Sequence, residues 1–365
     1  METEVREKAE EKSAANFTEN SAERPEGRPA EGPAETPAEI SEEKPAETAE
    51  TNPGERGETG PLGQPAEEVR EAYASPSGER VPVNKVIPFS SVDGPGSRTA
   101  VFLQECNIDC LYCHNPETRN LCVGCGRCVK TCPAGALSQP GKPGSRVLFD
   151  PAKCVACDTC IHVCAFGASP RIEYLTAAEC YERVRRQIPF IRGVTVSGGE
   201  CTMHPVFLTE LFRLCRADGL TTLLDSNGML DYSRFPELME VTDGVMLDIK
   251  AFTAEDHRRV TGYGNEMVLK NAVWLAERGK LPEIRTVAVP CLFDVKGTVR
   301  SACRLLAPYS RTDGIHRNIR YKLISCRPNG VRKEYLPKLD FPSPEYMSEL
   351  AETAREEGFT DIQVV

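Results

Sequence analysis

Residues 106–118 read CNIDCLYCHNPET and contain three cysteines in the spacing C-x3-C-x2-C, namely Cys106, Cys110 and Cys113. A tetrahedral thiolate site takes four ligands, and this stretch has no fourth cysteine. His114 could complete a zinc site. The alternative is that one coordination position stays open for a small molecule. The rest of the sequence has to be used to choose between a zinc site and an open site.

The composition divides the chain of 365 residues into two parts. Residues 1–80 contain 21 Glu, no Asp, and 9 Lys and Arg, with repeated PAE and AET fragments and almost no large apolar side chains. Such a segment cannot bury enough apolar surface to offset the entropy of ordering. We therefore expect a disordered acidic tail over 1–80 and a folded domain over 81–365. The tail has 12 more acidic than basic residues and the whole chain has 10 more, so the folded part carries a net charge of about +2.

Several classes of protein are disfavoured by the sequence. No basic block indicates nucleic-acid binding. The start METEVREKAE is acidic and polar, unlike a secretory signal, and no run of about 18 apolar residues offers a membrane span. We expect a cytoplasmic protein, in which the 17 cysteines stay reduced. Their spacing then indicates metal binding.

Eight further cysteines form two copies of the pattern C-x2-C-x2-C-x3-C, in CVGCGRCVKTCP (122–133) and CVACDTCIHVCA (154–165). In two-cluster ferredoxins, three thiolates of each run hold one [4Fe-4S] cluster and the fourth reaches across to the other. The pattern predicts a ferredoxin-like insert over 119–170. Its first cluster would be held by Cys122, Cys125, Cys128 and Cys164, and its second by Cys154, Cys157, Cys160 and Cys132. A pair of zinc knuckles is the alternative, although zinc sites usually pair two C-x2-C halves across a longer gap.

The remaining six cysteines are scattered singly, and most are expected to be small buried apolar residues. They are Cys180, Cys201, Cys215, Cys291, Cys303 and Cys326.

Apolar β-branched runs alternate with amphipathic segments from residue 99 onward. The expected strands cover 98–105, 192–200, 221–228, 243–250, 283–290 and 319–325. The expected helices cover 176–188, 205–217, 233–240, 266–279 and 296–307. This alternation implies a parallel sheet covered by helices. We expect an α/β fold, a partial (β/α)6 TIM-type barrel with the ferredoxin-like segment inserted after its first strand.

Small and charged residues follow three of the expected strands. The second strand ends in SGGE (197–200), the third in DSNG (225–228) and the fourth in MLDIK (246–250). Glycine lets the backbone approach a ligand closely, and a carboxylate beside it can accept a hydrogen bond from an ammonium group. Because the carboxyl ends of parallel strands share one face of a barrel, we expect these groups to meet in one site.

The order and spacing of these motifs resemble a known family. The cysteine stretch with Tyr112 before its last cysteine resembles the radical S-adenosylmethionine (SAM) enzymes, in which three cysteines hold a [4Fe-4S] cluster and the fourth iron binds SAM. VDGPGSRTAVFLQECNIDCLYCHNPET (92–118), with GGE, DSNG and MLDIK, is similar to the glycyl-radical-enzyme activating enzymes, such as the pyruvate formate-lyase activase. The resemblance runs from about residue 85 to the end. The two extra cluster motifs point to a YjjW-like branch with a ferredoxin insert.

The resemblance implies a set of cofactor contacts. Cys106, Cys110 and Cys113 would be the catalytic cluster ligands. The residues implied to border SAM are Tyr112, Cys113, His114, Gly198, Gly199, Glu200, Asp248, Ile249 and Lys250. A monovalent cation beside SAM is also implied, with the ligands Asp225, Ser226, the Met246 carbonyl and Asp248.

The same resemblance implies positions at the site for two arginines. Arg327, in LISCRPNG, stands where the pyruvate formate-lyase activase has a histidine near SAM, so Arg327 is expected at the cofactor. Arg285, in IRTVAVP, matches a family arginine at the site, but a salt bridge at the barrel rim explains it equally well.

The resemblance implies an anaerobic radical reaction. A flavodoxin or ferredoxin-type donor would reduce the active-site cluster, SAM would be cleaved, and the 5′-deoxyadenosyl radical would take a hydrogen atom from a glycine of a partner glycyl radical enzyme. The cofactors would be three [4Fe-4S] clusters, SAM and a monovalent cation. Two alternatives remain open at this point: a radical SAM enzyme that acts on a small molecule, and an iron-sulfur electron carrier.

Overall fold

The computed structural model describes residues 78–142, 144–310 and 318–365, which all belong to one compact unit within residues 59–365. The predicted tail lies outside the described residues except for its last three positions. In the part of the chain that is described, no helix combines the length and the hydropathy needed to cross a membrane.

The main sheet of the described residues has nine strands in the order β11-β10-β9-β8-β7-β6-β2-β1-β5. The six strands expected from the sequence are all present in its middle: β2 (Arg98–Leu103), β6 (Gly193–Gly198), β7 (Thr221–Ser226), β8 (Gly244–Asp248), β9 (Glu283–Ala288) and β10 (Arg320–Ser325). These six pair in parallel. The remaining three are β1 (Val81–Ser90), β5 (Glu173–Leu175) and β11 (Ile362–Val364). β11 is parallel to β10, whereas β1 is antiparallel to both β2 and β5.

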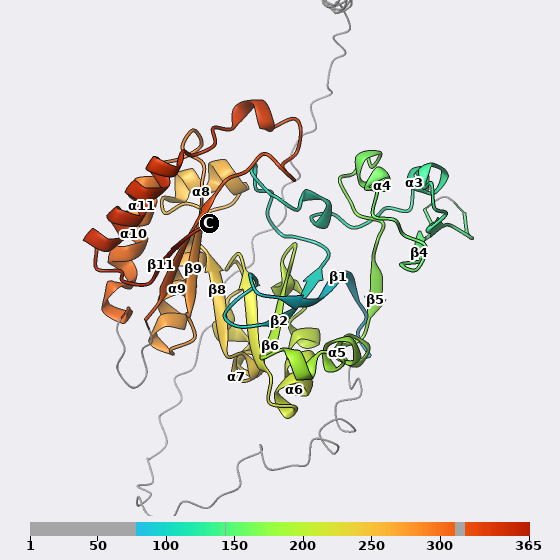
Figure 1. The fold of residues 1–365 in the computed structure, drawn as a ribbon, viewed down its shortest axis with the longest axis horizontal. Helices are drawn as coiled ribbons and strands as arrows, with labels where there is room; N and C mark the ends of the chain where they lie inside the picture. The colour runs from blue at the N-terminus through green and yellow to red at the C-terminus, as the bar shows by residue number, and fades with distance from the viewer. Residues whose placement is uncertain (1–77, 143, 311–317) are drawn as a thin grey trace, which may run out of the picture. The chain divides into compact units, whose positions relative to one another are not determined.

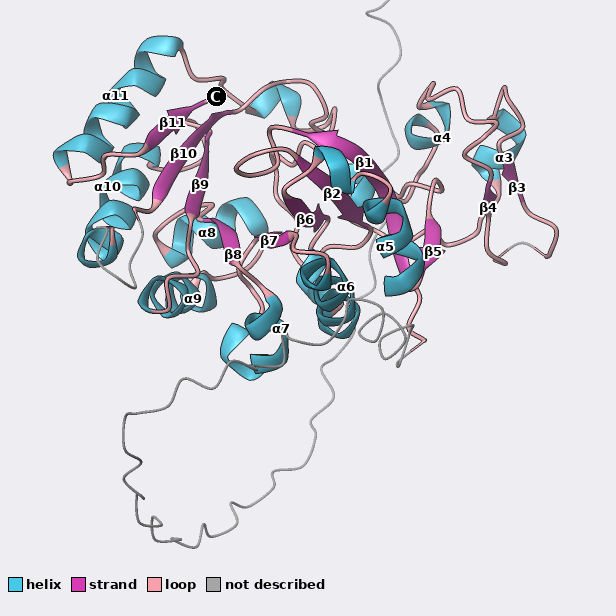
Figure 2. Ribbon diagram, turned by 60° about the horizontal axis from the view of Figure 1, so that its bottom comes forward, coloured by secondary structure: helices cyan, strands magenta, loops and turns pink. Residues whose placement is uncertain are grey.

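Helices follow the strands along the sheet, as Figures 1 and 2 show. The five expected helices are α5 (Ala177–Arg185), α6 (Pro205–Ala217), α7 (Pro236–Val241), α9 (Glu266–Glu277) and α10 (Val295–Leu306). Outside the inserted segment, two more were not expected among the described residues: α8 (Ala254–Thr261) and α11 (Pro344–Glu356). Capping residues define one end of α5 and one end of α8. A reciprocal capping box of Thr176 and Glu179 begins α5, and Gly262 in the left-handed conformation ends α8.

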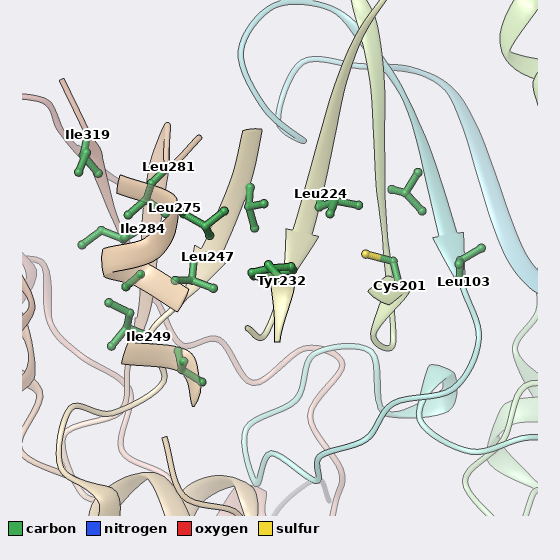
Figure 3. Packing of buried hydrophobic residues seen from close by; sticks show 14 of the residues in the cluster. Leu103, Cys201, Leu224, Tyr232, Leu247, Ile249, Leu275, Leu281, Ile284 and Ile319 are labelled. Atoms are coloured by element: carbon green, nitrogen blue, oxygen red, sulfur yellow. The ribbon is translucent and has the colours of Figure 1, made fainter. Parts of the chain in front are cut away.

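The main core lies between the sheet and its helices. Leu224, Leu247 and Ile284 come from three neighbouring strands and are packed in one buried cluster with Leu275 of α9 (Figure 3). Cys201 is part of the same cluster and is fully buried. The scattered cysteines follow the expectation for small apolar residues, since Cys180, Cys201, Cys215, Cys303 and Cys326 are buried, and Cys291 is the one exposed member of that set.

The segment inserted after β2 has little regular structure. It contains the short helices α3 (Arg127–Thr131) and α4 (Thr159–His162) and a hairpin of β3 (Leu137–Ser138) and β4 (Leu148–Phe149). Figure 1 shows α3, α4 and β4 grouped together. The buried core of this segment consists of Leu137, Val147 and two cysteines, Cys128 and Cys160. So small a core gives little hydrophobic stabilisation by itself.

Candidate active site

A cavity of about 220 Å³ lies at the carboxyl ends of the parallel strands, where a barrel places its active site. All three cysteines of the 106–118 stretch line it. The strand ends contribute the predicted site residues Gly198, Gly199, Glu200, Asp225, Ser226, Asp248 and Lys250, and the loop contributes Tyr112 and His114. The structure therefore brings together groups that are far apart in the sequence.

The cysteine loop is held in place by backbone hydrogen bonds on two sides. The Cys106 amide donates to the Arg119 carbonyl at 3.0 Å, and the amides of Asp109 and Leu111 donate to the end of α8 at 3.0 Å each. Glu105, directly before the loop, has φ of 88°, a conformation that non-glycine residues rarely adopt. The loop is thus a fixed turn and not a free segment.

The three thiols are desolvated. Burial raises the pKa of Cys106 to about 11 and of Cys110 to about 12, and it also raises the pKa of Cys113. Without a bound metal these groups are protonated thiols at neutral pH. Binding of iron would need thiolates and would therefore release these protons.

The two glycines of the SGGE motif are required by chain packing. A Cβ atom at Gly198 would lie 2.1 Å from the Leu103 carbonyl oxygen, and one at Gly199 would lie 2.1 Å from the Glu105 carbonyl oxygen. The amides of Gly199 and Glu200 donate to these same two carbonyls at 3.0 and 2.7 Å. The glycines therefore join the end of β6 to the segment that leads into the cysteine loop. Both also line the cavity, and the ligand contact expected from the sequence stays a prediction.

Glu200 is buried and forms hydrogen bonds within the protein. Its carboxylate accepts from the Thr202 amide and hydroxyl at 3.0 and 2.6 Å, from the Ser226 hydroxyl at 2.9 Å and from the Asn227 amide at 2.7 Å. Burial raises its pKa, and these hydrogen bonds partly offset that effect. Glu200 thus ties the end of β6 to the end of β7 at the cavity wall.

Arg285 is found both at the cavity and in ion pairs. It lines the cavity, and it also forms ion pairs with Asp225 at 2.8 Å and Glu283 at 2.5 Å. Burial lowers the pKa of Arg285, but the two carboxylates more than offset this, and the pKa lies above its ordinary value. Its Nη2 atom also lies 3.0 Å from the sulfur of Met246.

Asp248 and Lys250 form a second ion pair at the cavity, with 2.8 Å between Oδ2 and Nζ. Burial alone would lower the pKa of Lys250, but Asp248 and neighbouring groups raise it well above its ordinary value. Tyr112 is buried, and its hydroxyl lies 3.5 Å from the Lys250 carbonyl oxygen. The pair presents one positive and one negative group side by side.

Three predicted site residues do not present their side chains to this cavity. Ile249 is fully buried in the core, and its backbone N–H and C=O pair with Arg285 and Thr286. The Met246 side chain is also buried in the core. Arg327 is exposed and lines a neighbouring cavity, and its backbone N–H donates to the His114 ring at 3.3 Å. The expected contact of Arg327 with the cofactor stays a prediction.

The Ser226 hydroxyl, at one of the residues of the predicted cation site, forms three hydrogen bonds within the protein. It donates to Glu200 and accepts from the Tyr232 hydroxyl at 2.8 Å and from the Gly228 amide at 3.1 Å. One donor and two acceptor positions are thereby used. Among the described residues, no three His, Cys, Asp or Glu side chains are gathered closely enough to hold a single metal ion.

The insert places its eight cysteines around two smaller cavities. One is lined by Cys122, Cys125, Cys128 and Cys164, and the other by Cys132, Cys154, Cys157 and Cys160. In each cavity three cysteines come from one motif and the fourth from the other motif, which is the crossed arrangement expected from the sequence. Backbone amides of Ala136, Ala156 and Ala168 lie 3.3 to 3.5 Å from cysteine sulfurs.

Sequence reasoning missed a charged cluster that holds the cysteine loop. Asp109 forms ion pairs with both Arg119 and Arg332, and Arg332 also donates to the Cys110 carbonyl at 3.1 Å. All three residues line the cavity. Arg332 follows the last parallel strand of the barrel proper, and no local pattern marks it as a partner of residue 109.

Comparison with known proteins agrees with this geometry. The model of the radical SAM superfamily matches residues 101–294. A Haemophilus influenzae protein named "Putative glycyl-radical enzyme activating enzyme" is 31% identical over 306 residues, which cover 78% of this chain and 97% of that protein. The chain belongs to the radical SAM glycyl-radical-enzyme activating enzymes.

Two further relatives are similar over most of their length. The choline trimethylamine-lyase activating enzyme of Oleidesulfovibrio alaskensis is 32% identical, over 60% of this chain and 76% of that protein. The pyruvate formate-lyase-activating enzyme of Clostridium pasteurianum is 28% identical, over 74% of this chain and 98% of that protein. The chain is therefore a radical SAM activase, which uses a [4Fe-4S] cluster and SAM to install a glycyl radical on a partner glycyl radical enzyme.

Proposed function

We propose that the cavity at the strand ends is where this activase cleaves SAM, with Cys106, Cys110 and Cys113 as the three cluster ligands. The observation that carries the proposal is that one cavity is lined by all three cysteines and by the polar ends of β6, β7 and β8. The three buried thiols fit such a cluster because thiolate is the ligand that iron-sulfur clusters use. When bound, the cluster supplies the electron that splits SAM into methionine and the radical that takes a hydrogen atom from glycine.

The charged groups of the cavity complement the methionine part of SAM. That part carries one ammonium and one carboxylate, and the Asp248–Lys250 pair offers the opposite charges in one place. Tyr112 and His114 border the same space, and Glu200 holds the wall in shape. A monovalent cation beside SAM would draw on Asp225, Ser226, the Met246 carbonyl and Asp248.

The partner's glycine has room to approach from a neighbouring cavity of about 830 Å³. This cavity is lined by the loop between β1 and β2 and by β10 and β11, and it shares His114 and Ile324 with the cysteine cavity. A loop of the partner that enters here would reach the place where SAM is cleaved. Abstraction of a hydrogen atom requires that the glycine carbon be held close to the radical.

The two insert cavities would hold a further [4Fe-4S] cluster each, so the chain would bind three clusters. The crossed quartets support this proposal because they reproduce the ligand sharing of two-cluster ferredoxins. A small electron carrier of the flavodoxin or ferredoxin type would supply the electron.

Anaerobic incubation with SAM, dithionite and a candidate glycyl radical enzyme tests the function. We expect 5′-deoxyadenosine to form in step with a glycine-centred radical, detected by electron paramagnetic resonance, and we expect deuterium on the Cα of that glycine to pass into the deoxyadenosine. If the label instead comes from a small molecule and no partner gains a radical, the proposed site serves a different substrate.

A further inference from the structure

Asn227 directly follows β7 in the DSNG motif and lines the cavity that contains the three loop cysteines. The residue is only 5% exposed. Its side-chain amide has two N–H donors and one acceptor oxygen, and buried groups of this kind are nearly always hydrogen-bonded. The partners of the amide therefore indicate what Asn227 does at the site.

A turn of the backbone fixes the orientation of the Asn227 amide. The Met229 N–H donates to the Oδ1 atom of Asn227 at 3.0 Å. Because the oxygen of a side-chain amide is its only acceptor, this contact distinguishes the oxygen from the nitrogen. The nitrogen Nδ2 is the atom that faces the cysteine loop.

Both contacts of Nδ2 are with neighbouring residues of that loop. Nδ2 donates to the Asn107 side-chain oxygen at 2.8 Å, and it lies 4.0 Å from the sulfur of Cys106. The two N–H groups thus have one partner each. The contact with sulfur is long for a thiol, but a thiolate accepts more strongly, so binding of iron by Cys106 would strengthen it.

The segment around Asn227 is held firmly on its other side. The Asn227 backbone N–H donates to the buried Glu200 carboxylate at 2.7 Å. Asn271 of α9 is also buried, and its side chain donates to the carbonyls of Gly228 at 2.8 Å and Leu230 at 2.5 Å. Asn227 is therefore a donor with a fixed position, which does not have to be reorganised when charge develops at the sulfur.

The three loop cysteines differ in the donors around their sulfurs. Burial raises the pKa of Cys106 and of Cys113, and in both cases the backbone N–H two residues further along partly offsets this effect. Cys106 has the Asn227 amide in addition. In the part of the chain that is described, no side-chain donor is found within hydrogen-bond distance of the Cys110 or Cys113 sulfur. Cys106 is thus the thiol best prepared to carry negative charge.

We propose that Asn227 is a positioning residue whose amide acts on the Cys106 sulfur and raises the reduction potential of the active-site cluster. The inference rests on the proposed function of the cavity. Reduction adds one electron from an external donor to the cluster, and no covalent bond changes in that step. The added negative charge is shared by the thiolate ligands, and an N–H donor at one of the sulfurs stabilises it.

Two substitutions of Asn227 test the proposal. Asn227→Leu has a similar size and no N–H, whereas Asn227→Asp also lacks the N–H but keeps an acceptor for the Met229 amide and therefore the turn. The potential is measured by redox titration with electron paramagnetic resonance. The signal of the active-site cluster is the one that is missing when Cys106, Cys110 and Cys113 are all replaced with Ala.

Both variants should be harder to reduce. At the solution potential that half-reduces the active-site cluster of the unchanged protein, we expect the ratio of reduced to oxidised cluster to be at least about tenfold lower, equivalent to about 59 mV for one electron. The signals of the insert should not shift. An unchanged potential in both variants, or a shift in Asn227→Asp alone, would overturn the proposal, because the charge of the aspartate alone would explain the second result.

A second measurement detects the amide proton itself. Electron-nuclear double resonance in H2O and D2O should show an exchangeable proton coupled to the reduced active-site cluster, and this coupling should be lost in Asn227→Asp. The measurement decides the question even if Asn227→Leu does not fold. A coupling pattern identical to that of the unchanged protein would contradict a contact between the amide and the Cys106 sulfur.

Asn107→Ala is the matched control. Asn107 is exposed, and the substitution removes the 2.8 Å partner of Asn227 while leaving the amide beside Cys106. We expect the ratio of reduced to oxidised cluster to stay within about twofold of that in the unchanged protein. A shift as large as that in Asn227→Leu would show that Asn227 acts through the shape of the loop and not at the sulfur.

Iron content separates a failure of this inference from a failure of the proposed function. If the unchanged protein and the variant without the three loop cysteines bind equal amounts of iron, no cluster forms at the loop and the proposed function fails. If the loop cluster forms and cleaves SAM, but its potential and its proton coupling do not depend on Asn227, only the role of Asn227 is wrong.

Discussion

The active-site loop and the insert both collect cysteines, but they do so in different surroundings. The loop supplies three thiols to a cavity that also contains the ion pairs Asp248–Lys250 and Asp225–Arg285. Each insert cavity is lined by four cysteines and by mainly apolar side chains. The loop is packed against the large core, whereas the core of the insert consists of two aliphatic residues and two cysteines.

This difference indicates how cysteine thiolates can serve either a substrate-binding site or a site for electron exchange. Three thiols beside paired charges leave a coordination position and a polar wall for a substrate. Four thiols in an apolar cavity would complete the coordination of a proposed cluster and leave only an electron to be exchanged. The predictions below either disrupt the active-site loop or test whether the loop and the insert bind iron independently.

The largest effect is expected when the loop loses all its thiols. Replacing Cys106, Cys110 and Cys113 together with Ala should abolish SAM cleavage and lower the iron content from about twelve to about eight per chain. The eight irons of the insert serve as the internal control, since they should remain. Iron analysis and 5′-deoxyadenosine assays measure both quantities. Stoichiometric zinc without iron-sulfur absorbance would refute the cluster assignment in both regions.

Lys250→Met should lower the rate of SAM cleavage strongly, but less than the loss of all three loop cysteines. The change leaves Asp248 without its 2.8 Å partner at the cavity and removes a charge complementary to the carboxylate of SAM. We expect dithionite-driven SAM cleavage to fall about a hundredfold, equivalent to about 2.7 kcal/mol. Lys270→Met removes an exposed lysine that pairs with Asp231, and this control should retain nearly full activity. Equal losses in both variants would argue against a role of Lys250 at SAM.

Arg332→Met should have an intermediate effect confined to the loop. Arg332 pairs with Asp109 and donates to the Cys110 carbonyl, so its loss removes one of the attachments of the loop. We expect about a tenfold lower rate of SAM cleavage and faster loss of about four irons, while the irons of the insert stay bound. The neighbouring Lys333 is exposed, and Lys333→Met is the matched control. Iron loss from all three sites together would show that the two regions are not independent.

The smallest effect is expected from deletion of residues 2–77. Their composition is acidic and poor in large apolar residues, so they should contribute little to the folded domain. SAM cleavage and iron content should stay within a few-fold of the full chain. A large fall in the thermal transition of the shortened protein would show that this segment supports one of the two regions.

The parts of the fold with strong local patterns could be predicted from the sequence. The six central strands and five helices were found from their apolar spacing. β1 was missed because its pairing with β2 shifts register twice and its apolar residues do not alternate cleanly. α8 was missed because five of its eight residues, in AEDHRRVT, are charged or histidine. α11 could have been found from Ser343, which caps it, followed by Pro344 at its first position.

The composition of the site was predictable, but several of its roles were not. The motifs identified which strand ends meet, because parallel strands share one face. That Gly198 and Gly199 serve the approach of the Leu103–Glu105 backbone depends on tertiary packing, which no local pattern reveals. The Asp109–Arg332 pair spans 223 positions for the same reason. Arg327 is exposed and lines the neighbouring cavity, and its expected contact with SAM stays a prediction.

The very small core of the insert has a consequence for the lifetime of the protein in air. Leu137 and Val147 are the aliphatic members of its buried core in the described part of the chain, so an insert that holds the two proposed clusters would depend on them for order. Oxygen that destroys the two clusters would leave a loose segment of about fifty residues attached to an intact barrel. Proteases cut such segments first. In a damaged activase, proteolysis would therefore begin at the unfolded insert, before the barrel unfolds.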